Sequence, residues 1–361
     1  MFRNACRLGV SALVAGALAV GAHAVSGSSE VRLQGAGATF PAPLYSRMVA
    51  EYQQLHPDVK IDYQANGSGA GIKAITEQTV DFAGSDAPMS AKEVEACGKD
   101  NVVQVPSCAG AVVPAYNVPG VTKELNFSGD VLAEIYLGRI NKWNDAKLAA
   151  LNAGVALPDL AITPVYRTDG SGTNFVWTNY LSTQSQEFTQ SVGSGKEVKW
   201  PVGQGGKGNQ GVAAVLQQTK GALGYVEQAY ADQNKIAYGA VRNQAGKFVK
   251  ASPAAVSVAA GVAAGSMEGT VLKANLWNQT GDGSYPIASF TYLIVYKDLK
   301  NVKSKEQAKA LYDFLWWATH DGQKFATELD YAPLAPEALK KVEAALKEVK
   351  YQGAALNSTP K

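Results

Sequence analysis

The chain has 361 residues, of which 46% are hydrophobic and 18% are charged, and its formal net charge is +2. A charge this close to zero produces no global field that would attract nucleic acid or other polyanions, so any anion site must be local. The length exceeds what one compact core usually holds and predicts two lobes.

The first 24 residues are typical of a secretory signal peptide. Two arginines precede an apolar stretch from Leu8 to Ala22, and the tripeptide ending at Ala24 has the small-x-small pattern that signal peptidase cleaves. The apolar stretch is about 15 residues long, which is shorter than the roughly 20 residues that span a bilayer. We expect cleavage after Ala24, which leaves 31 basic and 31 acidic side chains in an exported protein.

Three short segments place small residues and hydroxyl groups at an expected helix start. The first, over 35–43, contains Thr39 and two prolines and precedes a helix. The second, over 66–71, contains Ser68 and follows a strand over 59–63. The third, over 167–173, contains Arg167 and Ser171 and follows a strand over 161–166. Helix starts offer unpaired N–H groups and the positive end of the helix dipole, so they bind anions.

Each segment alone is better explained as an ordinary turn. Three such segments in one chain favour a shared tetrahedral oxyanion, to which Arg167 would add a fork that can bind two oxygens. We therefore predict a local anion site that combines Arg167 with these helix starts.

Asp86, in the segment over 80–90, adds a carboxylate to the prediction. A protonated phosphate can donate a hydrogen bond to this acid, whereas sulfate cannot and would set two acceptors against each other. A buried, unpaired acceptor costs roughly 1–3 kcal/mol, and more when it is charged. The acid would therefore exclude sulfate, although a solvated turn residue or a helix cap explains Asp86 equally well.

Cys97 and Cys108 remain after cleavage, in a compartment that permits disulfides. We expect a bridge between them, which would close a short loop and contribute about 3 kcal/mol; the alternative is two unpaired buried thiols. The mature chain keeps only His56 and His320, in separate contexts, so we expect no metal site and no cofactor.

The last third of the chain contains the clearest helices. A capping box from Ser304 to Gln307 precedes an apolar face, and Pro336 opens a final helix. Runs over 109–116 and 290–296 are expected strands that connect the lobes. Strands that alternate with helices predict an α/β fold with largely parallel sheets.

Two glycine-rich patterns do not support other chemistry. The segment over 203–208 fits G-x-G-x-x-G, but no acidic residue follows at the expected spacing, so we interpret it as a loop before a helix at Val212. Ser171 lies in Gly-Ser-Gly but lacks the G-x-S-x-G spacing and a nearby histidine, which argues against a nucleophile.

Five motifs resemble the periplasmic phosphate-binding component of Pst-type ABC transporters. They are GAGATFPAP over 35–43, VDFAGSDAP over 80–88, IYLGRINKW over 135–143, RTDGSGT over 167–173 and GALGYVE over 221–227. The resemblance covers nearly all of the mature chain. It differs over 67–71, where GSGAG replaces the GSSGG of many members and a second hydroxyl is lost.

The resemblance implies a type II periplasmic-binding fold, with two α/β lobes of mixed, mostly parallel sheet that are joined by two crossovers. We expect one lobe over 25–110 and 288–361 and the other over 111–287. The family's phosphate contacts correspond to the following residues: Thr39, Phe40, Ser68, Asp86, Arg167, Ser171, Gly172 and Thr173. Asp169 corresponds to the acid that holds the binding arginine.

The resemblance implies a monomeric, non-enzymatic protein of the periplasm that binds inorganic phosphate and delivers it to the permease subunits of an ABC transporter. No nucleic-acid partner is expected. The alternative is a secreted phosphate-ester hydrolase on the same scaffold, and the absence of a His/Asp cluster from the sequence argues against it.

Overall fold

A computed structural model describes residues 30–98 and 100–356. The expected signal peptide and the last five residues lie outside this part of the chain. The strands are β1 (Val31–Gly37), β2 (Val59–Ala65), β3 (Phe82–Ser85), β4 (Val102–Tyr116), β5 (Asn126–Phe127), β6 (Thr163–Arg167), β7 (Gln204–Gly206), β8 (Ala222–Glu227), β9 (Ala237–Tyr238), β10 (Ala240–Arg242), β11 (Phe248–Val249), β12 (Ala288–Tyr296), β13 (Lys350–Tyr351) and β14 (Ala354–Ala355).

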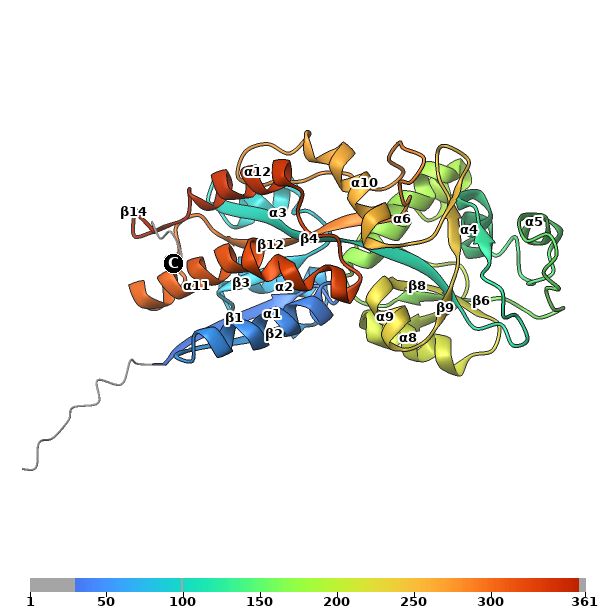
Figure 1. Ribbon diagram of the computed structural model, residues 1–361, viewed down its shortest axis with the longest axis horizontal. Helices are drawn as coiled ribbons and strands as arrows, with labels where there is room; N and C mark the ends of the chain where they lie inside the picture. Colours follow the sequence, from blue (N-terminus) through green and yellow to red (C-terminus); the bar gives the residue numbers. More distant parts are fainter. Residues whose placement is uncertain (1–29, 99, 357–361) are drawn as a thin grey trace, which may run out of the picture.

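Helices lie between and around these strands (Figure 1). They are α1 (Ala42–Leu55), α2 (Ser68–Thr76), α3 (Ala91–Ala96), α4 (Gly129–Tyr136), α5 (Ala146–Leu151), α6 (Gly172–Gln184), α7 (Gln186–Ser191), α8 (Gly208–Gln218), α9 (Gln228–Gln233), α10 (Pro253–Ala264), α11 (Lys305–Thr319) and α12 (Pro336–Leu346), with 3₁₀ turns over Asp321–Phe325 and Thr327–Leu329. None of the helices in the described ranges is long and apolar enough to span a bilayer.

The main sheet has the order β2-β1-β3-β12-β4-β8-β6-β7, and β9 also pairs with β4. The pairs β1–β2, β1–β3, β6–β7 and β6–β8 are parallel, whereas the pairs formed by β12 and β4 are antiparallel. The fold is therefore the expected mixed α/β arrangement, and each antiparallel pair of this sheet involves one or both of its two longest strands, β4 and β12.

The long strand β4 connects the two halves of this sheet (Figure 1). It pairs with β12 from Val102 to Ala111 and with β8 from Val112 to Tyr116. The segment after α10 also contacts its first part, because the N–H of Gln104 donates to the carbonyl of Thr270 at 2.8 Å. The predicted lobe boundaries remain a prediction; the observed change of partner lies within one residue of the expected boundary at 110.

Most of the helices and strands expected from sequence are present. The 59–63 and 161–166 strands correspond to β2 and β6, the 290–296 run lies inside β12, and the 109–116 run is the second half of β4. Ser304 caps α11 by accepting from the N–H of Gln307 at 3.2 Å. The capping box is incomplete, because the Gln307 side chain accepts from the N–H of Lys303 instead of that of Ser304.

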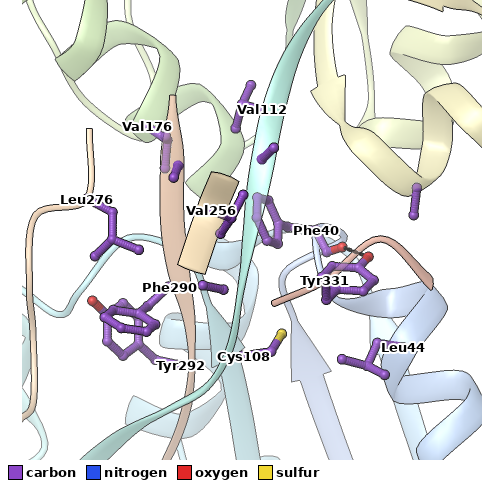
Figure 2. Packing of buried hydrophobic residues seen from close by; sticks show 14 of the residues in the cluster. Phe40, Leu44, Cys108, Val112, Val176, Val256, Leu276, Phe290, Tyr292 and Tyr331 are labelled. Carbon is purple, nitrogen blue, oxygen red and sulfur yellow. Dashed lines mark hydrogen bonds between the residues drawn. The ribbon is translucent and has the colours of Figure 1, made fainter. Parts of the chain in front are cut away.

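The buried core joins residues from distant parts of the chain (Figure 2). Phe40 and Tyr331 lie with ring centroids 6.2 Å apart, and the Tyr331 hydroxyl donates to the Phe40 carbonyl at 2.7 Å. This contact fixes the backbone immediately before α1, within the first predicted anion segment.

The expected disulfide is wrong: Cys97 and Cys108 are both free and buried. Cys97 follows α3 and its sulfur lies 3.4 Å from the Thr76 hydroxyl. Cys108 lies within β4, opposite Thr291 of β12, and burial raises the pKa of its thiol. The two thiols are held in different packing environments, which the compartment and the sequence spacing do not reveal.

Candidate functional site

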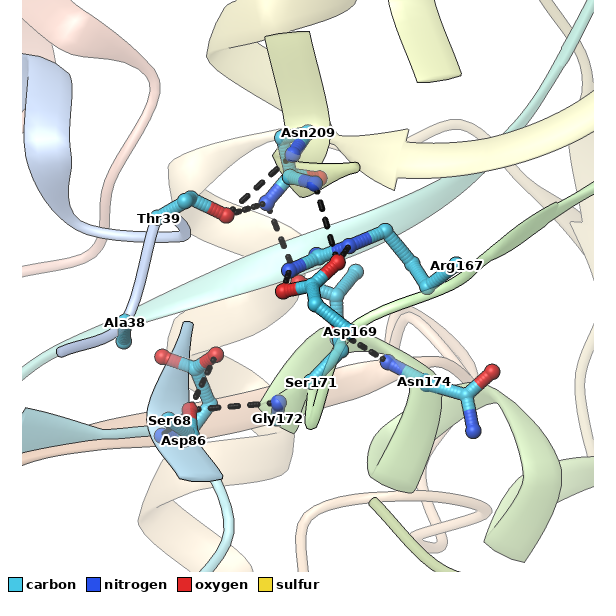
Figure 3. Close-up of polar contacts among 12 residues, drawn as sticks. Ala38, Thr39, Ser68, Asp86, Arg167, Asp169, Ser171, Gly172, Asn174 and Asn209 are labelled. Atoms are coloured by element: carbon cyan, nitrogen blue, oxygen red, sulfur yellow. Dashed lines mark hydrogen bonds and ion pairs between the residues drawn. The ribbon is translucent and has the colours of Figure 1, made fainter. Parts of the chain in front are cut away.

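The predicted anion residues come together where several helices begin (Figure 3). Ser68 and Gly172 are the first residues of α2 and α6, and Thr39 lies just before α1. The polar side chains of the group are almost completely buried, with exposed fractions of 5% or less for Thr39, Ser68, Asp86, Arg167, Ser171 and Thr173. Three helix N-termini in a dry environment provide N–H groups and a positive potential for one anion.

Arg167 ends β6 and is held by Asp169. Its Nε donates to Asp169 Oδ1 at 2.8 Å, and its Nη2 donates to Asp169 Oδ2 at 2.6 Å. Asp169 Oδ1 also accepts from the N–H of Gly208 at 2.9 Å. Although burial raises the pKa of Asp169, the hydrogen bonds and charge of Arg167 bring it below its usual range, so the acid is ionised and fixes the guanidinium.

The third nitrogen of the guanidinium, Nη1, is not held by Asp169. Arg167 Nη1 is buried and has no hydrogen-bond partner among the described residues. Leaving a buried donor without a partner costs roughly 1–3 kcal/mol of stability, and more when the donor is charged. The guanidinium that Asp169 orients therefore presents one charged NH₂ group, Nη1, that has no partner among the described residues.

Asp86 follows β3 and is held on one side by β12. Its Oδ1 accepts from the Thr291 hydroxyl at 2.8 Å, and its Oδ2 lies 3.5 Å from the Ser68 hydroxyl. Burial raises the pKa of Asp86 from 3.8 to about 7, against hydrogen bonding from Thr291 and the charge of Arg167. At neutral pH the acid can therefore either accept or donate one proton.

Small residues allow these segments to meet. The N–H of Gly172 donates to the Ser68 hydroxyl at 3.1 Å, and the N–H of Gly69 donates to the carbonyl of Gly170 at 2.7 Å. A Cβ atom on Gly172 would lie 2.6 Å from Ser68 Oγ, so a larger residue would push α6 away from α2. A glycine at 172 is thus required by the close approach of two helix starts.

Further contacts connect the two halves of the sheet around the site. The Tyr230 hydroxyl donates to the Thr39 carbonyl at 2.6 Å, and Lys196 forms a short ion pair with Glu93. The N–H of Ser171 donates to the carbonyl of Lys196 at 3.0 Å, so Lys196 connects this ion pair to the start of α6. The elements are therefore held closely together.

Ser171 acts as a helix cap rather than as a nucleophile. Its hydroxyl accepts from the N–H of Asn174 at 3.0 Å, which is the usual role of a serine at this position. No group of three or more His, Cys, Asp or Glu side chains with metal-binding geometry occurs in the described ranges. The geometry supports binding of an anion by fixed hydrogen bonds and one positive charge.

Sequence reasoning identified the residues of the three helix starts but missed several that hold them. Asn209, in the first turn of α8, donates through Nδ2 to the hydroxyls of Thr39 at 2.8 Å and Thr173 at 3.1 Å. The segment over 203–208 is not only a loop, because it forms β7 and α8 begins at Gly208, before the expected Val212. Thr291, which fixes Asp86, was also missed.

The chain is similar to known proteins over most of its length. The model of a family described as the PBP superfamily domain matches residues 24–321. The chain is 45% identical over 321 residues to the phosphate-binding protein PstS of Pasteurella multocida, and the matched region covers 88% of this chain and 91% of that protein. A PstS protein of Methanocaldococcus jannaschii is 39% identical over 315 residues, with 82% and 80% covered.

A solved structure has the same fold. The phosphate-binding protein of Stenotrophomonas maltophilia superposes with a TM-score of 0.68 at 20% identity and covers 87% of this chain and 93% of its own. At this identity the likeness supports the fold alone.

Proposed function

The chain belongs to the PstS family of phosphate-binding proteins within the PBP superfamily, and from this premise we infer that it binds inorganic phosphate for import by an ABC transporter. It is a binding protein and not an enzyme. The observation that supports phosphate at this site is Arg167 Nη1, a buried charged donor that the protein orients but leaves without a partner.

The proposed ligand contacts are those that the family resemblance implies, and the burial of these residues supports them. Arg167 Nη1 would donate to one phosphate oxygen, and the hydroxyls of Thr39, Ser68, Ser171 and Thr173 and the N–H group of Phe40 would donate to the others. The N–H of Gly172 would join them by exchanging its present bond to the Ser68 hydroxyl for one to phosphate. Asp86, held by Thr291, would accept the phosphate proton. Donors in a water-excluded site bind an anion far more strongly than the same groups in water.

We further propose that the two halves of the sheet act as lobes, over 25–110 with 288–361 and over 111–287, that close on the ligand. Such hinge closure is common in periplasmic binding proteins. The protein would be a monomer in the periplasm, exported by the signal peptide ahead of residue 25, and would deliver phosphate to permease subunits.

Calorimetry tests the proposal directly. Phosphate and sulfate are titrated separately into the purified mature protein, after removal of any carried-over phosphate by unfolding and refolding. At pH 9, where Asp86 is ionised, we expect one phosphate per chain and no measurable sulfate binding at the same concentrations. Absent phosphate binding, or equal binding of the two anions, would overturn the proposal.

A further inference from the structure

We propose that Asn209 is a positioning residue that sets the direction of the Thr39 and Thr173 hydroxyls, so that both donate their hydrogens to the bound anion. The inference rests on the proposed function, because it assigns a role within the same phosphate site. Asn209 lies in α8, outside the segments from which the sequence predicts the anion site.

The orientation of the Asn209 amide is fixed by the backbone. Its Oδ1 accepts from the N–H of Glu227 at 2.9 Å. A backbone N–H can only donate, so the amide oxygen must face β8 and the NH₂ group must face the other way. The side chain is fully buried, so water cannot replace this contact.

The NH₂ group then uses both of its hydrogens on two hydroxyl oxygens. Nδ2 lies 2.8 Å from Thr39 Oγ1 (Figure 3) and 3.1 Å from Thr173 Oγ1. Thr39 belongs to the segment before α1 and Thr173 belongs to α6, so a single amide connects two of the anion segments.

These contacts determine the direction of the Thr39 hydroxyl. Its oxygen accepts from Asn209 Nδ2 and from the Asn209 backbone N–H at 3.2 Å. Both lone pairs are thereby occupied. The hydroxyl hydrogen must point elsewhere, and none of the hydrogen bonds recorded among the described residues uses it. The same logic applies more weakly to Thr173, which accepts from Asn209 once.

A fixed direction matters because a hydroxyl can donate or accept, and an anion accepts only. A threonine that was free to rotate would spend part of its time with its lone pairs facing the phosphate. Asn209 removes that orientation before the ligand arrives, so less freedom is lost on binding. The residue is therefore expected to increase phosphate affinity without touching the ligand.

A double-mutant cycle between Asn209→Ala and Thr39→Val separates this role from a structural one. Phosphate affinity is measured by calorimetry for the wild type, both single variants and the double variant. We expect each single variant to bind roughly tenfold more weakly, as for one lost hydrogen bond to a charged group. The double variant should bind no more weakly than the poorer single variant.

Independent losses would overturn the inference, because a double variant about a hundredfold weaker would mean that Asn209 does not act through Thr39. An Asn209→Ala protein within about twofold of the wild type would also overturn it. A wild type that binds no phosphate would instead refute the proposed function, so the two failures are distinguishable.

Two further variants control for folding. Asn152→Ala removes another buried amide, whose Nδ2 donates to the carbonyls of Asn126 and Leu148, and should reduce thermal stability while leaving phosphate affinity unchanged. Asn209→Leu keeps a similar shape and adds no charge but loses the donors, so it allows the cycle to be measured if the alanine variant does not fold. Phosphate affinity unchanged in Asn209→Leu would again contradict the inference.

Discussion

Replacing Asp86 with asparagine is expected to admit sulfate to the site. The Thr291 hydroxyl donates to Oδ1 at 2.8 Å, which would keep the new amide oxygen on that side and place the NH₂ group where Oδ2 now lies, beside Ser68. An acceptor that faces the anion thus becomes a donor. Sulfate carries no proton at neutral pH, so it gains a partner where it previously met a carboxylate.

The magnitude follows from the pKa of Asp86, which burial raises to about 7. Above that pH, sulfate can bind the wild type only if the acid takes up a proton, which costs about 1.4 kcal/mol per pH unit. Wild-type sulfate affinity should therefore rise roughly tenfold for each unit that the pH falls from 9 to 7. Asp86→Asn should bind sulfate about a hundredfold more tightly than the wild type at pH 9, without this pH dependence.

The assay is displacement of phosphate by sulfate at several pH values, followed by calorimetry. Asp81→Asn is the matched control, because Asp81 is a second buried carboxyl with a raised pKa that contacts Gln34 and Gln307 outside the site. Its sulfate affinity should equal that of the wild type. Exclusion of sulfate by Asp86→Asn, or sulfate binding to the wild type that does not change with pH, would refute the reasoning.

Three other predictions concern the same residues and the cysteines. Arg167→Ala should weaken phosphate binding by about 2–5 kcal/mol, because it removes a buried charge and leaves Asp169 unpaired; calorimetry measures it, and a loss below tenfold would contradict the role. The raised pKa of Asp86 means that its contribution to stability is fully present below pH 3.8 and is lost as the pH rises through about 7. Without ligand, the free energy of unfolding of the wild type should therefore fall by about 4 kcal/mol relative to that of Asp86→Asn as the pH rises from 3.8 to about 7. Urea unfolding measures this change, and curves of stability against pH that run parallel for the two proteins would contradict the prediction. Finally, the unfolded, unreduced mature protein should react with two equivalents of a thiol reagent, because Cys97 and Cys108 are free; no reaction would indicate a bridge.

Local features of the fold could be predicted where the signal lay within a few residues. Pro41 and Pro43 fit the start of α1, and Ser304 caps α11. The three glycine- and hydroxyl-rich segments also lie at helix starts, because glycine permits the close approach that helices make at an anion site. The meeting of these segments was an inference from their shared chemistry, and the structure brings them together.

Residues that act through tertiary contacts could not be predicted in the same way. Thr291 lies in the middle of β12 and resembles any buried strand residue until the register that opposes Tyr292 to Ser85 brings it to Asp86. Cys97 and Cys108 are close in sequence, but their surroundings depend on how α3 and β4 pack. Asn209 could have been found, because Lys207-Gly208-Asn209 also begins a helix after small residues.

A crystal structure of the protein grown with phosphate tests the central claim most directly. We predict a tetrahedral anion within hydrogen-bonding distance of Arg167 Nη1 and Asp86, with the Thr39 hydroxyl donating to it while Asn209 holds its oxygen. Phosphate bound elsewhere, or Arg167 Nη1 paired with a protein acceptor in the complex, would contradict the account.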